Sequence, residues 1–237
     1  MFTLPRSINR KIGRAMHDYS MLAHGDRVLI AVSGGVDSLV LTWILANWRH
    51  KAPINYELRA VHIDMGFGGR EDYKAVSAEM DRLNIPLLVE HSNFGVKNQD
   101  DDVTCYRCAR RRRGRLFELA REHNCQSLAL GHHMDDIIET LFINMLYSGN
   151  ISTMRPGQKL FSGRLTLIRP LAYLSKDEVW ILARLAGITP VKNPCPRADH
   201  NKRDEVRDLL KSLYQRDPLY KANIFASLHN VKTDYLL

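Results

Sequence analysis

The chain is poor in the features that mark membrane, secreted and low-complexity proteins. No apolar run approaches the length of a membrane span, and residues 1–16 (MFTLPRSINRKIGRAM) contain no apolar signal core. The 237 residues include only 4 cysteines, which argues against a disulfide framework, and they contain no internal repeat. These absences predict a cytoplasmic globular protein without a membrane segment, and the 45% hydrophobic content is enough for one substantial core.

The lysine of the usual nucleotide-binding loop is also missing. Residues 28–38 (VLIAVSGGVDS) form an apolar run that breaks at two glycines and resumes as a helical pattern, which predicts a strand, a tight turn and the start of a helix. A Walker loop needs GxxxxGK[ST], so this turn is of another kind. Glycine lets a ligand approach the main chain, and the N-terminus of the next helix attracts phosphate. The expected nucleotide-binding residues of the turn are Ser33, Gly34, Gly35, Val36, Asp37 and Ser38.

Asp37 lies in the first turn of that helix, where a carboxylate either caps the helix or holds a magnesium ion facing phosphates. An ordinary glycine turn is the alternative to a phosphate site. The complete SGGVDS pattern resembles the pyrophosphatase loop (PP-loop) of enzymes that split ATP into AMP and pyrophosphate. The resemblance implies that the chain binds ATP with Mg²⁺ and that Asp37 takes part in catalysis.

Alternating strand and helix patterns predict an α/β fold with a doubly wound parallel sheet. Because ligands bind at the carboxyl ends of parallel strands, we place Asp64 and Gly131 near the nucleotide, and we favour Asp64 over the neighbouring His62. The expected domains are an N-terminal helical segment (1–24), a catalytic domain (25–187) and a basic helical segment (188–237). The expected strands are 28–32, 56–64, 85–90, 127–131 and 164–168. The expected helices are 7–22, 38–48, 71–83, 105–123, one within 131–149 (GHHMDDIIETLFINMLYSG), 175–187 and two in 188–237, with a polar lid or loop at 93–102.

Positive charge is concentrated in two stretches of the chain. The formal net charge is +8, and the excess lies in residues 110–115 and 192–216. Clustering of this kind is typical of proteins that bind a phosphate-rich polymer, although many basic faces are merely solvated.

Three of the four cysteines are placed for chemistry. Cys105 and Cys108 form a CxxC at the start of a predicted helix, and Cys195 follows far along the chain in NPCP. Redox dithiols, zinc sites and iron-sulfur clusters all use CxxC. A structural zinc would need a fourth ligand, such as Cys125 or His200. Cys125 opens a buried strand and is expected to be a core residue; three thiolates on a cubane cluster would leave one iron open to an external sulfide.

Four motifs together resemble the TtcA family of tRNA 2-thiocytidine synthetases: SGGVDS, CYRCARRRRGRLFELA, LGHHMDDIIETLFINMLYSG and IRPLAYLSKDEV. The resemblance implies ATP-dependent replacement of a cytidine C2 oxygen by sulfur in a tRNA anticodon loop, assisted by a [4Fe-4S] cluster on Cys105, Cys108 and Cys195. The sulfur would come from a cysteine desulfurase persulfide or from free sulfide. We assign Asp135 a catalytic or magnesium role, and Arg112, four residues after Cys108, the task of neutralising the adenylate phosphate.

Several alternatives stay open at this stage. Asp135 and Asp136 could simply be the N-terminal acids of a helix, and Arg112 could be a solvated arginine. A PP-loop thiolase acting on uridine would use the same cluster, a zinc-stapled RNA-binding module would need no catalysis, and a homodimer is one possible assembly. A PP-loop lysidine synthetase has no use for three cysteines. The chain differs from the family in having NPCP where a second CxxC often occurs, and in a short C-terminal portion, which bears on the identity of the tRNA and of the base.

Overall fold

The computed structural model describes residues 4–67, 73–92, 105–191, 195 and 202–235. Its described residues form two compact units, one of residues 1–133 and 156–198 and one of residues 134–155 and 199–237. The predicted lid at 93–102 lies outside the described residues. The boundaries expected at residues 24 and 187 stay a prediction.

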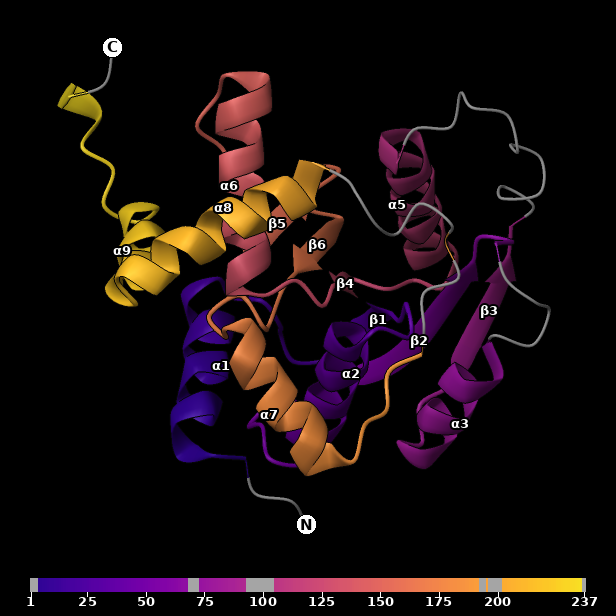
Figure 1. Cartoon of the computed structure of the whole chain (residues 1–237). Coiled ribbons are helices and arrows are strands. Elements are labelled where there is room, and N and C mark those ends of the chain that lie inside the picture. The colour runs from indigo at the N-terminus through magenta and orange to yellow at the C-terminus, as the bar shows by residue number, and fades with distance from the viewer. Residues whose placement is uncertain (1–3, 68–72, 93–104, 192–194, 196–201, 236–237) are drawn as a thin grey trace. The chain divides into compact units, whose positions relative to one another are not determined.

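The first unit is built on a six-stranded sheet in the order β3-β2-β1-β4-β6-β5 (Figure 1). Five strands run parallel, and β5 pairs antiparallel with β6 at one edge. The strands are β1 (Arg27–Ala31), β2 (Glu57–Asp64), β3 (Leu87–His91), β4 (Ser127–Ala129), β5 (Gly157–Leu160) and β6 (Leu165–Ile168). The predicted α/β class and the five predicted strands are therefore confirmed.

Helices cover both faces of this sheet because consecutive residues of its central strand β1 are apolar and point to opposite faces. Val28 and Ile30 of β1 share one cluster of buried residues with α1 (Arg6–Asp18), α2 (Val36–Trp48), α3 (Tyr73–Arg82) and α7 (Lys176–Ala186). Leu29 of β1 points to the other face, in a cluster with α5 (Cys105–Glu122). Helix α2 is buried nearly all round, which fixes its N-terminus relative to β1.

Two local features differ from the expectations. Strand β5 was not predicted, because GQKL is polar, begins with glycine and lies at a sheet edge where only one side needs to be apolar. Helix α1 ends at Asp18 instead of residue 22, since Ser20 adopts a φ of 44°, which a helix cannot contain. By contrast, the start of α7 follows the prediction: Ser175 and Glu178 form a capping box, and Gly187 ends the helix in the left-handed conformation.

The second unit is helical. It contains α6 (Met134–Ser148), α8 (Lys202–Arg216), α9 (Leu219–Ser227) and the short 3-10 helix η1 (Thr233–Tyr235). Ile138 of α6 packs against Val206 and Leu210 of α8 in its core. The two basic helices predicted after residue 188 are thus present.

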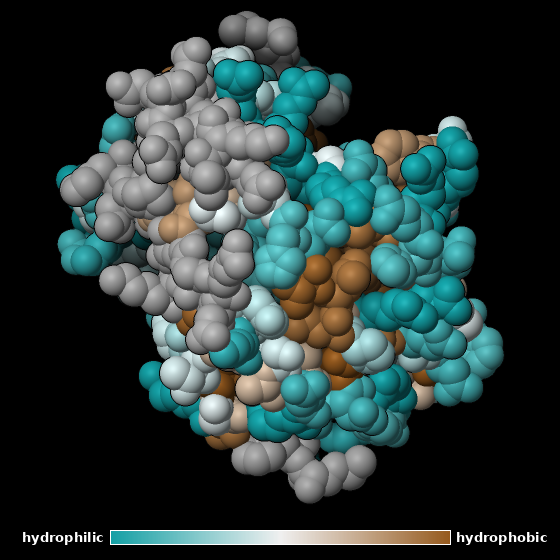
Figure 2. Space-filling model, turned by 90° about the vertical axis from the view of Figure 1, so that its right-hand side faces the viewer, coloured by the Kyte–Doolittle hydropathy of each residue, from teal (hydrophilic) through white to brown (hydrophobic). Residues whose placement is uncertain are grey.

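The described residues contain no helix both long enough and apolar enough to cross a membrane. In Figure 2 the coloured atoms of the face are mostly hydrophilic, with a hydrophobic area near the centre and smaller ones elsewhere.

Candidate active site

The SGGVDS turn lies between the end of β1 and the start of α2 and is tied together by its own serines. The Ser38 hydroxyl donates to the Gly35 carbonyl at 2.9 Å and accepts from the Ser33 backbone N–H at 3.1 Å. The N-cap of α2 is Gly35, which has no side chain. The N–H groups in the first turn of α2 therefore donate no hydrogen bond to an N-cap side chain. A rigid turn with a helix N-terminus behind it is suited to phosphate.

Position 34 requires glycine because of its backbone conformation and because neighbouring side chains leave little room for a Cβ atom. Its φ of +86° lies in the left-handed region, which favours glycine. Its carbonyl accepts from the Val191 N–H at 2.9 Å, and an added Cβ would lie 3.2 Å from side-chain atoms of Val191 and Val76. The turn is therefore held from outside by the segment that follows α7.

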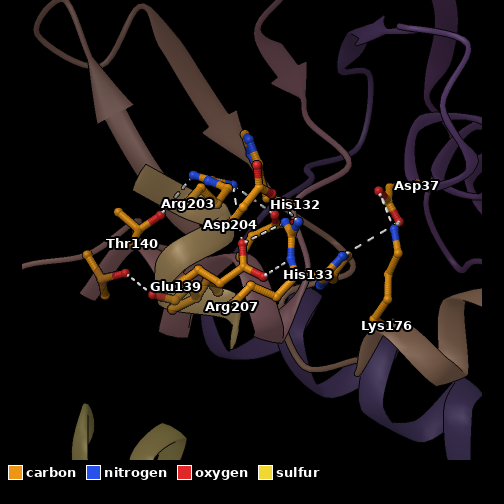
Figure 3. A network of polar contacts seen from close by, with 12 residues as sticks. Asp37, His132, His133, Glu139, Thr140, Lys176, Arg203, Asp204 and Arg207 are labelled. Atoms are coloured by element: carbon orange, nitrogen blue, oxygen red, sulfur yellow. Dashed lines mark hydrogen bonds and ion pairs between the residues drawn. The ribbon is translucent and has the colours of Figure 1, made fainter. Parts of the chain in front are cut away.

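Asp37 does not cap α2; its carboxylate faces a lysine. Lys176 Nζ lies 2.7 and 2.8 Å from the two carboxylate oxygens, and His133 Nε2 lies 3.6 Å from Oδ1 (Figure 3). The side chain of His133 is only 5% exposed, whereas those of Asp37 and Lys176 are about one third exposed. A carboxylate and an ammonium thus meet at the mouth of the phosphate turn, where a ligand can reach both.

Lys176 is a candidate site residue that the sequence pattern did not predict. It is the first residue of α7, after the Ser175 N-cap, and the capping box alone accounted for that stretch. The position of the lysine was itself a signal, because a cation in the first turn of a helix opposes the helix dipole unless an anion lies nearby. In the structure that anion is the Asp37 carboxylate.

Gly131 follows β4 and lies directly against the turn. A Cβ added to Gly131 would come within 2.9 Å of the backbone carbon and oxygen of Asp37 and of the Ser38 nitrogen. Only glycine allows this approach, so the structure brings Gly131 to the predicted nucleotide site as a close-packing residue.

Asp64 ends β2 at the same edge of the sheet. Its Oδ1 accepts from the Gly66 N–H at 2.8 Å, and its Oδ2 lies 3.2 Å from His91 Nδ1. The neighbouring His62 places its Nδ1 2.8 Å from the Val32 carbonyl, as a half-buried structural histidine does. Asp64, with a quarter of its side chain exposed, is the better placed of the two for a ligand.

Helix α5 begins at Cys105, and Cys108 follows one turn later with a half-buried side chain. The side chains of residues 110–113, including Arg112, are exposed. Arg115 is different: it contacts Glu90 at 2.8 Å, Glu118 at 2.9 Å and Glu122 at 2.8 Å. Arg115 therefore ties α5 to β3, and residues 110–113 are the exposed part of the predicted arginine run.

The other cysteines differ in their surroundings. Cys125 is 5% exposed in the core against α5, as predicted, and burial raises the pKa of its thiol. Cys195 is half-buried. The side chain of Cys105 lies outside the described residues. Among the described side chains no group of three or more histidine, cysteine and acidic residues is placed to hold a metal ion, so the three-cysteine ligand set stays a prediction.

In the second unit the acidic residues of α6 contact the basic residues of α8 and α9. Asp135 pairs with Lys221, and Asp136 lies 3.1 Å from Arg203. Glu139, whose side chain is 7% exposed, accepts two hydrogen bonds from Arg207 at 3.0 and 3.3 Å (Figure 3). Asp135 and Asp136 thus have a structural use, which is separate from the catalytic role predicted for Asp135.

Comparison with known proteins shows to which family this arrangement belongs. The fold and the loop define a PP-loop protein, and the model of the PP-loop domain family matches residues 4–213. The chain is 38% identical to the tRNA-cytidine(32) 2-sulfurtransferase of Geotalea uraniireducens, over 97% of this chain and 93% of that one. It is 36% identical to the enzyme of the same name from Geobacter sulfurreducens, over 98% and 92%. The chain belongs to this family of tRNA-cytidine(32) 2-sulfurtransferases, the TtcA family.

Solved structures agree on the fold. The U34-tRNA thiolase NcsA from Methanococcus maripaludis, described with its [4Fe-4S] cluster, superposes with a TM-score of 0.80 at 23% identity, over 97% of this chain and 80% of that one. The NAD⁺ synthetase of Burkholderia pseudomallei superposes with a TM-score of 0.53 at 15% identity, over 100% and 92%. At these identities the likeness concerns the fold alone.

Proposed function

We propose that the chain is an ATP-dependent tRNA sulfurtransferase that converts the cytidine at position 32, in the anticodon loop, to 2-thiocytidine. Family membership gives the reaction, since the relatives are tRNA-cytidine(32) 2-sulfurtransferases. The observation that supports it in this chain is the PP-loop turn with Lys176 against Asp37 at its mouth. That pair supplies the cation that the Walker motif would have provided.

The reaction requires activation because the C2 oxygen of cytidine is a poor leaving group. The oxygen bonds to the α-phosphorus of ATP, the bond to the β-phosphate breaks and pyrophosphate leaves. Sulfur at the sulfide oxidation level then attacks C2, and AMP leaves with the oxygen. Preorganised N–H groups and cations stabilise charge that develops on phosphates. The N–H groups of the turn and Lys176 act on pyrophosphate, and Arg112 neutralises the adenylate phosphate.

Asp37 is the carboxylate that fits Mg²⁺, which prefers oxygen ligands and usually binds through one or two carboxylates and substrate phosphates. The ion, held by Asp37, would supply positive charge that offsets the charge of the phosphates. Lys176 keeps the Asp37 carboxylate oriented toward the mouth of the turn. Asp64, Gly131 and the residues of the turn then bound the nucleotide, and Asp135 is our candidate for a further polar role.

The donor chemistry of Cys105, Cys108 and Cys195 suits a [4Fe-4S] cluster. Thiolates are the usual ligands of such clusters, and Cys105 and Cys108 are one helical turn apart at a helix N-terminus, which lowers thiol pKa values. A cluster held by three thiolates supplies one iron able to accept an external sulfide. Cys125, buried under the sheet, takes no part.

The remaining partners follow from this reaction. The tRNA contacts the exposed arginines 110–113, and the enzyme works in the cytoplasm. The sulfur comes from free sulfide, or from a cysteine desulfurase persulfide whose outer sulfur a thiol reductant releases as sulfide. A homodimer is compatible with the proposal, which does not require one.

Two measurements test the proposal. With ATP labelled at the α- and γ-phosphates and tRNA present, AMP and pyrophosphate are expected, and ADP with orthophosphate as the sole products would refute PP-loop chemistry. Mass spectrometry of nucleosides from a deletion strain should show that 2-thiocytidine disappears and returns with the gene. Loss of a thiouridine with 2-thiocytidine unchanged would identify a uridine enzyme instead.

A further inference from the structure

Helix α1 presents three arginines on one exposed face. Arg6, Arg10 and Arg14 are spaced four residues apart, so they project from the same side at intervals of about 6 Å along the axis. All three are exposed, and the Arg14 side chain is 74% exposed. The opposite face, formed by Ile8, Ile12 and Ala15, is buried in the core of the first unit, so α1 has no apolar face to offer a membrane.

This pattern is not explained by the stability of the helix. The first turn of α1 contains no acidic residue, and Arg6 there opposes the helix dipole. Arg14 lies 3.4 Å from the carboxylate of Asp18, near the end of the helix. Three cations in a row on a rigid helix, at a spacing comparable with that of neighbouring phosphates in a strand, match a nucleic-acid backbone.

The arginine face is also connected to the candidate active site. Lys11 Nζ contacts Glu178 at 2.8 Å, and Glu178 lies in the first turn of α7 together with Lys176, which contacts Asp37. Helix α1 ends beside Gly157, which pairs with Ile168 at the carboxyl end of β6, the sheet edge that carries the PP-loop turn. The Arg14 guanidinium lies 6.0 Å from the centre of the Tyr173 ring, in the segment leading to α7.

We infer that the α1 arginine face is a binding surface for tRNA phosphates, separate from arginines 110–113 of α5. The inference rests on the proposed function, because the partner is the tRNA substrate. A tRNA whose target base reaches the PP-loop turn extends past the start of α7, and arginine binds phosphate through paired N–H donors. The surface adds affinity and positions the RNA, and it takes no part in the chemical step.

The test compares two triple variants that remove the same charge. In the first, Arg6→Gln, Arg10→Gln and Arg14→Gln keep helix propensity. In the control, Arg121→Gln, Lys159→Gln and Arg164→Gln remove exposed cations near the edge where the parallel strands begin. Affinity for tRNA transcript is measured over a range of salt concentrations, together with thermal unfolding, kcat and KM for tRNA.

The α1 variant should bind tRNA about tenfold or more weakly at 0.1 M salt, and its slope of log affinity against log salt should fall by about two, since each phosphate contact contributes roughly 0.7 to 0.9. KM should rise with kcat unchanged, while the control stays near wild type. Equal tRNA affinity and equal salt slope for the α1 variant and the control would overturn the inference. Normal tRNA binding by the α1 variant together with loss of turnover with a protein sulfur donor would overturn it as well. If wild-type protein makes no 2-thiocytidine, the proposed function fails instead, whatever the salt slopes.

Discussion

Lys176 Nζ contacts both carboxylate oxygens of Asp37, at 2.7 and 2.8 Å, and joins the first turn of α7 to the first turn of α2. The two residues are 139 positions apart in the chain. The pair therefore brings a cation to a phosphate turn whose own sequence lacks one.

Replacing that cation should slow ATP cleavage. We expect Lys176→Met to lower the rate of AMP formation with saturating tRNA by about a hundredfold, because one preorganised group facing developing charge is worth about that much. Lys176→Arg should recover part of the rate. The matched control is Lys11→Met, which also removes a lysine paired with a carboxylate but not at the turn. Equal rates for the two methionine variants would contradict the role of Lys176.

Adding one methyl group at Gly131 should disturb the turn. In Gly131→Ala the new Cβ would lie 2.9 Å from backbone atoms of Asp37 and Ser38, so we expect a loss of about 1 to 3 kcal/mol in the free energy of unfolding and at least tenfold weaker ATP binding. Gly114→Ala in α5 is the control: nothing lies within 4 Å of its added Cβ, and the change should stabilise the helix by about 0.5 to 1 kcal/mol. Denaturant unfolding and ATP titration measure both effects. Normal ATP affinity in Gly131→Ala would mean that the turn can shift without loss.

The thiol of Cys125 should react slowly in the folded protein. Burial raises its pKa, so at pH 8 a smaller fraction is thiolate than in an ordinary cysteine, and the fraction grows as the pH rises toward the raised pKa. Alkylation by iodoacetamide, followed by mass spectrometry from pH 7 to 10, should modify Cys125 at an appreciable rate only at the alkaline end or after unfolding. Rapid alkylation of Cys125 at pH 7 would contradict its burial.

Iron content should separate the cysteines by role. Anaerobic reconstitution of single Cys→Ala variants is expected to give a full iron and sulfide complement for Cys125→Ala and a marked loss for Cys105→Ala, Cys108→Ala and Cys195→Ala. The control is Cys125→Ala itself, provided that its unfolding midpoint shows a folded protein. If Cys195→Ala keeps its iron while Cys125→Ala loses it, the ligand assignment is wrong.

A chemical role for Asp135 can be distinguished from its ion pair with Lys221. Removing either partner breaks the pair, so Asp135→Asn and Lys221→Met should destabilise the second unit to a similar extent. If Asp135 also acts on ATP, magnesium or tRNA, Asp135→Asn should lower kcat at least tenfold more than Lys221→Met. Similar kcat values for the two variants would leave Asp135 with a structural role only.

The sequence predicted those features that depend on local pattern. The β1 strand and the SGGVDS turn were predictable from an apolar run broken at Gly34 and Gly35, and the α7 cap from Ser175 and Glu178, because each signal lies within a few residues. Strand β5 was not predictable, because it is a strand through its pairing with β6 and its own composition does not favour one.

The sequence also could not show which residues distant in the chain form ion pairs with one another. Nothing near Lys176 indicates Asp37, and nothing near Asp135 indicates Lys221, because each ion pair exists only once the helices have packed. Likewise, the arginines of α5 look alike in sequence, yet Arg115 contacts three glutamates while residues 110–113 are exposed.

The hydrogen bond from the Val191 N–H to the Gly34 carbonyl sets a limit on where the third cysteine can go. Cys195 comes four positions after Val191, and a fully extended chain spans at most about 3.6 Å per residue, so the two Cα atoms can never be more than about 14 Å apart. The covalent chain keeps Cys195 within this radius of Val191, and as long as the hydrogen bond persists Val191 stays in contact with the nucleotide turn. ATP bound at the turn and a ligand bound at Cys195 should then both favour the Val191–Gly34 contact, so that each strengthens the binding of the other.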